Sequence, residues 1–150
     1  MLKAMDIMTT EPITLAPDED IPSAVKTMLE KRINGAPVVE NGKVVGVLTQ
    51  GDLVAQQKKL SLPSFFTLLD GIFPLSSMAD LDQEMQKITA LSVKDAMTSP
   101  ALTVGPETGI DELAAIMSNK KMYTLPVVDD GELVGVVGKE DVLRTLMGEQ

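Results

Sequence analysis

The side chains best placed to do chemistry stand in two short stretches, one in each half of the chain. The first reads Thr49-Gln50-Gly51-Asp52 and the second Gly138-Lys139-Glu140-Asp141. A hydroxyl followed three residues later by a carboxylate, at the start of an expected helix, is close to a capping box, in which each side chain bonds the other residue's backbone N–H. That role alone stabilises a helix by ~1 kcal/mol and needs no ligand.

Composition excludes several kinds of site. The chain has no histidine and no cysteine, which removes the commonest general base, the commonest metal ligand, thiolate sites and disulfides. No P-loop, nucleophile elbow or cluster of metal ligands occurs, so we expect no enzyme, no metal site and no obligatory cofactor. A formal net charge of −9 with 13 Lys and Arg argues against nucleic-acid binding. No signal peptide or long apolar span is evident, so we expect a cytoplasmic protein without membrane contact.

The elements that must position these stretches follow from turn signals and apolar periodicity. In the first half, residues 13–15 favour a short strand, residues 21–32 a helix, and residues 36–48 a hairpin. The hairpin turn is Asn41-Gly42, and Asn-Gly is the strongest two-residue turn signal because both positions accept a positive φ. Thr49 then opens a closing helix.

The second half repeats these elements in the same order without a gap, at position n+89. Pro37-Val38-Val39 recurs as Pro126-Val127-Val128, and the hairpin returns at residues 125–137 around Asp130-Gly131. A unit that cannot bury its own apolar face packs on its twin, so the repeat predicts a pseudo-symmetric module with a seam between halves. Small-molecule sites favour such seams.

Helical spacing predicts which side chains of the helices face the core. In the first half these are Ile21, Ala24, Val25, Met28, Leu53 and Val54, and in the second Ile110, Leu113, Ala114, Met117, Val142, Leu143, Leu146 and Met147.

The chain therefore divides into a first repeat (residues 1–57), an insertion (58–91) and a second repeat (92–150). The insertion is too long for a structureless loop. Its later part favours a helix around Leu81, Met85 and Ile88, and residues 65–75 hold every phenylalanine. This apolar segment either folds back to seal the module or forms a dimer or partner contact, with a membrane contact as a third alternative.

Both copies resemble the cystathionine-beta-synthase-type (CBS) domain, and the pair resembles a stand-alone Bateman module. The resemblance is carried by Gly35-Ala36-Pro37-Val38-Val39, by Gly46-Val47-Leu48-Thr49-Gln50-Gly51-Asp52 and by Leu125-Pro126-Val127-Val128. It covers residues 3–57 and 92–148. It implies an α+β (or α/β) fold of two β-α-β-β-α units, packed sheet to sheet about a pseudo-twofold with two clefts. Such modules often bind adenosine-containing ligands and commonly pair into disc-shaped dimers.

The resemblance also implies the ligand-binding residues. Asp52 would hold ribose hydroxyls, since a carboxylate accepts charge-assisted bonds from a vicinal diol, and Thr49 would hold a phosphate at the helix start. The other residues expected in the first cleft are Ile7, Thr14, Ala16, Ala36 and Pro37. Those expected in the second cleft are Ala96, Thr103, Gly105, Tyr123, Leu125, Pro126, Lys139 and Asp141.

Several roles stay open at this point. Tyr123 either stacks on an adenine or packs beside a strand. The basic pairs Lys31-Arg32 and Lys120-Lys121 either neutralise phosphates or complement helix dipoles. Because Gly138 stands where the first copy has Thr49, we expect the two clefts to be unequal and the Thr49/Asp52 cleft to bind better.

The sequence thus predicts a regulatory CBS pair that senses an adenosine-containing ligand, either AMP, ADP, ATP or S-adenosylmethionine. Binding would shift the population of two arrangements and signal through a homodimer or an unknown protein partner. The alternative is a dimeric protein–protein interaction scaffold that binds no nucleotide.

Overall fold

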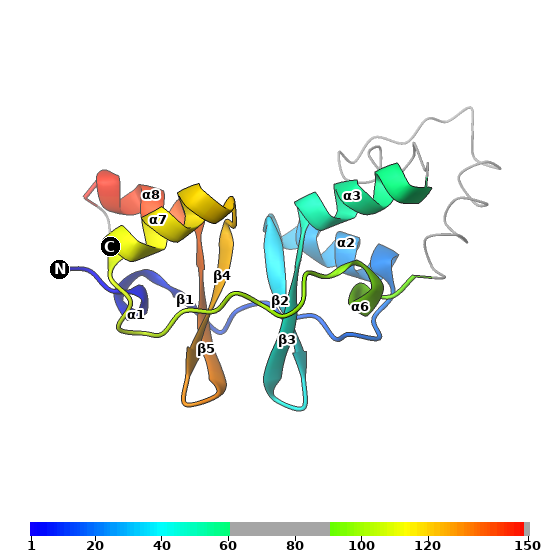
Figure 1. The fold of residues 1–150 in the computed structure, drawn as a ribbon, viewed down its shortest axis with the longest axis horizontal. Coiled ribbons are helices and arrows are strands. Elements are labelled where there is room, and N and C mark those ends of the chain that lie inside the picture. Colours follow the sequence, from blue (N-terminus) through cyan, green and yellow to red (C-terminus); the bar gives the residue numbers. More distant parts are fainter. Residues whose placement is uncertain (61–90, 149–150) are drawn as a thin grey trace.

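The computed structural model describes residues 1–60 and 91–148 (Figure 1). The apolar segment 65–75 and the helix expected around residues 81–88 lie outside this part of the chain. The described elements are α1 (Ala4–Ile7), β1 (Thr9–Thr10), α2 (Ile21–Lys31), β2 (Gly35–Glu40), β3 (Lys43–Thr49), α3 (Gln50–Leu60), α6 (Val93–Ala96), α7 (Ile110–Lys120), β4 (Thr124–Asp129), β5 (Glu132–Gly138) and α8 (Lys139–Leu146).

Both predicted hairpins are confirmed. Strand β2 pairs with β3, and β4 with β5, each antiparallel and each with one irregularity in register at the same place. Asn41 and Gly42 have φ of 53° and 79°, and Asp130 and Gly131 have φ of 53° and 80°. Two consecutive positive φ values define the type I′ turn, whose twist matches that of the flanking strands.

The two hairpins stand side by side at the centre, with α2 and α3 on one outer side and α7 and α8 on the other (Figure 1). The sheets approach so closely at Gly35 that a Cβ there would lie 2.7 Å from Thr124 Oγ1. At the turns, Lys43 Nζ donates to Gly131 O at 3.3 Å. The sheet-to-sheet packing of two CBS-like repeats is thereby confirmed.

The segment that leads into each repeat, which we call its leader (residues 3–10 and 92–99), packs on the other repeat. Ala4 of α1 is buried in the second core, whereas Val93 and Ala96 of α6 are buried in the first. The exchange extends the second sheet to three strands in the order β1-β5-β4. An ion pair at the surface also joins the two repeats. The carboxylate of Glu107 accepts a hydrogen bond from Lys3 and raises the pKa of Lys3.

Two glycines permit this exchange. A Cβ on Gly135 would lie 2.9 Å from the carbonyl oxygen of Thr9, and one on Gly46 would lie 2.8 Å from that of Thr98. Real Cβ atoms do not approach backbone oxygens so closely, so these two positions need glycine for close approach. The cores therefore cross the boundary between the two sequence repeats.

Two details of the sequence-based prediction are wrong. Residues 13–15 and 102–104 do not form strands, because only Leu15 and Val104 make parallel bridges, to Val38 and Val127. The regular strand of the first leader lies earlier, at Thr9–Thr10, where no proline interrupts the hydrogen-bond ladder.

The second wrong detail concerns the outer faces of the helices. Five side chains expected in the core are exposed, namely Val54, Ala114, Leu143, Leu146 and Met147. Helix α8 buries no residue fully, and Leu146 is 80% exposed. Helical spacing identifies an apolar face but not what covers it. Among the described helices, none has the length and apolar character needed to cross a membrane.

Candidate functional site

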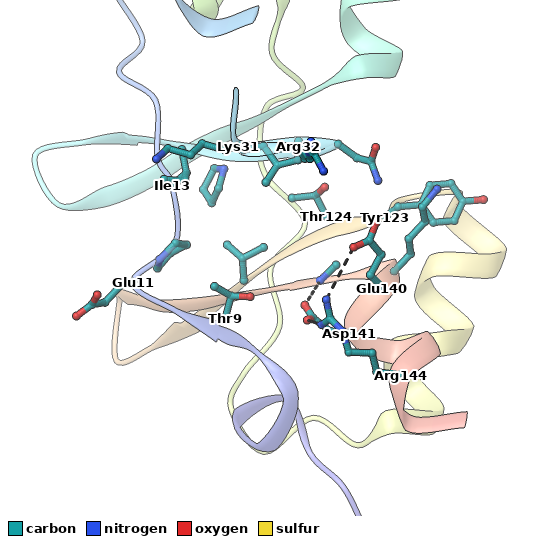
Figure 2. Close-up of a pocket in the computed structure, with 18 residues that line it drawn as sticks. Thr9, Glu11, Ile13, Lys31, Arg32, Tyr123, Thr124, Glu140, Asp141 and Arg144 are labelled. Atoms are coloured by element: carbon teal, nitrogen blue, oxygen red, sulfur yellow. Dashed lines mark hydrogen bonds and ion pairs between the residues drawn. The ribbon is translucent and has the colours of Figure 1, made fainter. Parts of the chain in front are cut away.

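A pocket of about 290 Å³ opens at the seam between the halves (Figure 2). From the first half it is lined by Thr9, Glu11, Pro12, Ile13, Lys31, Arg32, Ile33, Asn34, Gly35 and Pro37. From the second half it is lined by Tyr123, Thr124, Val136, Gly138, Lys139, Glu140, Asp141 and Arg144. Its volume lies just below the range of about 300–1,000 Å³ that is typical of small-molecule sites.

Among the carboxylates that line the pocket, Asp141 is held by two short hydrogen bonds. Its Oδ2 accepts from the backbone N–H of Gly138 at 2.8 Å, and its Oδ1 accepts from Arg144 at 2.8 Å. The side chain is 11% exposed. A carboxylate offers about four acceptor positions. Two bonds leave Asp141 able to accept both hydroxyls of a diol without releasing either present partner.

The first turn of α8 places further groups at the pocket. Gly138 precedes the helix and has no side chain to cover its N-terminus, where the helix dipole favours negative charge. Lys139 Nζ lies 5.7 Å from the centre of the Tyr123 ring. Tyr123 lines the pocket and is 43% exposed, so its ring is not packed in the core.

Lys31 and Arg32 approach from the opposite wall, at the C-terminal end of α2 (Figure 2). Arg32 has left-handed backbone angles of φ 54° and ψ 47°. The N–H of Arg32 donates to Leu29 O at 3.3 Å and that of Ile33 to Met28 O at 3.0 Å, which is a Schellman ending. Within residues 1–60 and 91–148, neither Lys31 nor Arg32 has an ion-pair partner. Two cations without an ion-pair partner among the described residues therefore line this wall, together with the carboxylate of Glu11.

Asp52, the carboxylate equivalent to Asp141, does not line this pocket. The expected capping box is present: Asp52 Oδ2 accepts from Thr49 N–H at 2.9 Å, and Thr49 Oγ1 accepts from Asp52 N–H at 3.1 Å. The Thr49 hydroxyl also lies 3.1 Å from Oδ2, and Oδ1 accepts from Thr98 Oγ1 at 2.8 Å. Structural partners thus occupy the carboxylate expected to hold ribose.

The pocket brings together residues that the sequence assigned to different clefts. Pro37, expected beside Asp52, lines it together with Tyr123, Lys139 and Asp141. The other expected residues lie outside its lining, namely Ile7, Thr14, Ala16, Ala36, Thr49, Asp52, Ala96, Thr103, Gly105, Leu125 and Pro126. Ala36 and Leu125 are fully buried, so their side chains belong to the two cores.

Some lining residues had no place in the sequence-based prediction. Arg144 could have been found, because it follows Asp141 by three residues on one helix and such pairs are neighbours. Thr9 and Glu11 carried no local signal, since they reach the pocket only through the exchange of leaders. Among the described residues, no group of three or more Asp or Glu side chains is arranged to hold a metal.

Comparison with known proteins places the chain in a family. The CBS domain pattern matches residues 4–59 and 93–148. Protein MJ1426 of Methanocaldococcus jannaschii is 31% identical over 153 residues, which cover 95% of this chain and 89% of that protein. The chloroplastic CBSX1 of Arabidopsis thaliana is 30% identical, with 98% of this chain and 62% of that protein covered. The inosine-5′-monophosphate dehydrogenase of Korarchaeum cryptofilum is 30% identical, but the chain spans only 23% of that enzyme.

Similarity to solved structures supports the same family. CBSX2 in complex with AMP has a TM-score of 0.73 at 25% identity, with 99% of this chain and 98% of that chain covered. The CBS domain pair of protein MJ0100, in complex with 5′-methylthioadenosine and S-adenosyl-L-methionine, has a TM-score of 0.72 at 26% identity, with 100% and 99% covered. With both repeats matched and the tandem fold shared, the chain belongs to the CBS domain family.

Proposed function

We propose that this CBS pair is a regulatory module that binds an adenosine-containing ligand in the pocket at Asp141. The observation that carries the proposal is a carboxylate with two unused acceptor positions, across one pocket from two cations, Lys31 and Arg32, that have no ion-pair partner among the described residues. The structures of CBSX2 with AMP and of MJ0100 with adenosyl ligands support the ligand class.

Each part of such a ligand has a complementary group. Asp141 accepts hydrogen bonds from the ribose diol, which are the charge-assisted kind. Tyr123 offers an exposed ring on which an adenine can stack. Lys31 and Arg32, with the N-terminus of α8, attract phosphate oxygens.

The charge distribution favours AMP, ADP or ATP over S-adenosylmethionine. Arg144 is already paired with Asp141 at 2.8 Å and lies 3.9 Å from Glu140. The opposite wall carries the cations Lys31 and Arg32 and one carboxylate, Glu11, so its net charge is positive. A phosphate is attracted by this net charge, whereas a sulfonium is repelled by it.

A ligand in this pocket contacts both halves, because each half supplies one wall. It therefore stabilises whichever arrangement of the halves closes on it, and only this differential affinity can transmit a signal. In this proposal the output passes to a homodimer or to a protein partner, and the module itself performs no catalysis.

Titration calorimetry with AMP tests the proposal. The native chain should bind AMP, and at 100 times the dissociation constant AMP should add roughly 2.7 kcal/mol to the free energy of unfolding. Asp141→Ala should lose most of the affinity. Asp20→Ala is the matched control, because Asp20 also caps a helix, accepting from Ser23 N–H at 2.7 Å, but lies outside the pocket. If AMP, ADP and ATP at millimolar concentration all leave the free energy of unfolding of the native chain unchanged, the proposal is wrong.

One observation favours the second candidate, a dimeric interaction scaffold. Leu143, Leu146 and Met147 of α8 are 54%, 80% and 77% exposed, a face that a second copy or a partner protein could cover. Sedimentation without nucleotide tests it. A dimer that forms without nucleotide, in a chain that binds no nucleotide, would favour the scaffold over the sensor.

A further inference from the structure

The carboxylates of Asp52 and Asp141 occupy equivalent positions but accept different numbers of hydrogen bonds. Asp52 accepts three: from the N–H and the hydroxyl of Thr49 at 2.9 and 3.1 Å, and from the hydroxyl of Thr98 at 2.8 Å. Within residues 1–60 and 91–148, Asp141 accepts two, from Gly138 and Arg144. With about four acceptor positions on a carboxylate, Asp52 has one left and Asp141 has two.

A vicinal diol needs two acceptor positions. Asp141 can therefore take a ribose without giving up a partner, whereas Asp52 must first release one. The bond from the Thr49 N–H belongs to the capping box that starts α3, so releasing it would also uncap the helix. The bond from Thr98 occupies Oδ1, whereas both bonds from Thr49 go to Oδ2, so exchanging the Thr98 bond leaves the capping box intact.

Thr98 is held where it can make this bond. Its N–H donates to Val47 O at 2.9 Å, and its carbonyl accepts from Val47 N–H at 3.0 Å. The next residue is fixed as well, since Ser99 Oγ donates to Val45 O at 2.8 Å. These contacts arise from the exchange of leaders, which brings a segment of the second repeat onto β3 of the first.

The equivalent residue in the other repeat behaves differently. Thr9 pairs with Val136 in β1 and lines the open pocket, and none of the hydrogen bonds of Asp141 comes from it. Instead Arg144 bonds Asp141 from within α8, at a position where the first repeat has Ala55. The asymmetry thus lies in the partners of the two carboxylates as well as in the replacement of Thr49 by Gly138.

We propose that Thr98 is a latch: its hydroxyl fills the ribose-binding position of Asp52, so that each chain binds one nucleotide, at Asp141. This inference rests on the proposed function, and it reverses the ranking of the clefts expected from the sequence. The missing hydroxyl at Gly138 leaves acceptor capacity free, while the hydroxyls of Thr49 and Thr98 consume it at Asp52. The second repeat thereby controls access to the first repeat's cleft.

Calorimetric titration of the full chain with AMP tests the latch. The native chain should show one binding event. Thr98→Val, which keeps the β-branched shape and the backbone bonds to Val47, should strengthen binding at the Asp52 cleft roughly 10-fold and so reveal a second event. Thr98→Ser is the matched control, because it retains the hydroxyl and should behave like the native chain. Adding Asp52→Ala to Thr98→Val should remove the second event again.

The outcomes separate the two proposals. Two equal sites in the native chain would overturn the latch and leave the proposed function standing. A Thr98→Val chain that binds AMP with the same stoichiometry and affinities as the native chain would also overturn the latch alone. No binding of AMP by either chain would overturn both proposals.

Discussion

Replacing Arg32 with glycine should separate the stability of the fold from ligand binding. Arg32 ends α2 at φ 54° and ψ 47°, where glycine is the usual residue. A side chain in the left-handed region costs roughly 1–2 kcal/mol. Glycine would relieve that cost but would also gain roughly 0.5–1 kcal/mol of conformational freedom in the unfolded chain. The free energy of unfolding should therefore rise by about 0.5–1 kcal/mol.

The same change should weaken nucleotide binding. Arg32 is one of three pocket cations, with Lys31 and Lys139, that have no ion-pair partner in the described part of the chain, so its guanidinium is free to pair with a phosphate. Hydrogen bonds to charged groups are worth about 1.5–3 kcal/mol, and solvent exposure places this one near the lower value. AMP affinity should fall about 10-fold, since 1.4 kcal/mol corresponds to a factor of ten. Adenosine, which lacks the phosphate, should bind as before.

Urea unfolding and calorimetry measure the two effects on the same samples. Lys121→Gly is the matched control, because Lys121 ends α7 with φ 54° and ψ 39° but lies outside the pocket. It should gain similar stability and keep its AMP affinity. The reasoning fails if Arg32→Gly lowers the free energy of unfolding, or if it weakens AMP binding no more than Lys121→Gly does. An equal loss for AMP and adenosine would refute the assignment of Arg32 to the phosphate.

Three further predictions concern the fold and the pocket. Gly135→Ala should lower the free energy of unfolding in urea by about 1–3 kcal/mol, because the added Cβ would press on the Thr9 carbonyl. Gly51→Ala is the control, because a Cβ there has room and should not destabilise the fold. Equal effects of the two changes would argue against the close approach at Gly135. Thr49→Ala should cost ~1 kcal/mol of stability through the lost cap while AMP binding at the Asp141 pocket persists, which a calorimetric titration of the same variant checks. Lys31→Gln should lower AMP affinity about 2–5-fold, and more at low salt than at high salt, while adenosine binding stays unchanged. A loss of AMP affinity that does not depend on salt would contradict an electrostatic role for Lys31.

The sequence predicted those parts of the fold that depend on local signals. Asn41-Gly42 and Asp130-Gly131 determine the type I′ turns, and the turns determine the register of each hairpin. Helix α2 begins as expected after its acidic run, where Asp20 accepts from Ser23 N–H. In each case the residues that carry the signal are within a few positions of the structure they specify.

The exchange of leaders could not be predicted in this way. The segments Asp6–Thr9 and Asp95–Thr98 are similar, so either could pack on either repeat as far as its own sequence indicates. The choice depends on contacts made across the chain, such as Met8 against Gly135. The ranking of the clefts depended on this choice. A comparison of Thr49 with Gly138 shows only how the two helix caps differ. The hydrogen-bond partners of the carboxylates also include Thr98, which bonds Asp52, and Arg144, which bonds Asp141.

The exchange also bears on how a signal could form. Thr9 lines the pocket from the first leader and Asp141 lines it from α8, so the two walls are joined through the pairing of β1 with β5. On the other side, Thr98 joins the second leader to Asp52. A shift of one leader therefore changes a wall of one cleft. Because each core contains residues of the other repeat's leader, such a shift also affects the other half. A ligand at Asp141 would act on both repeats at once, which is what a regulatory module requires of its binding site.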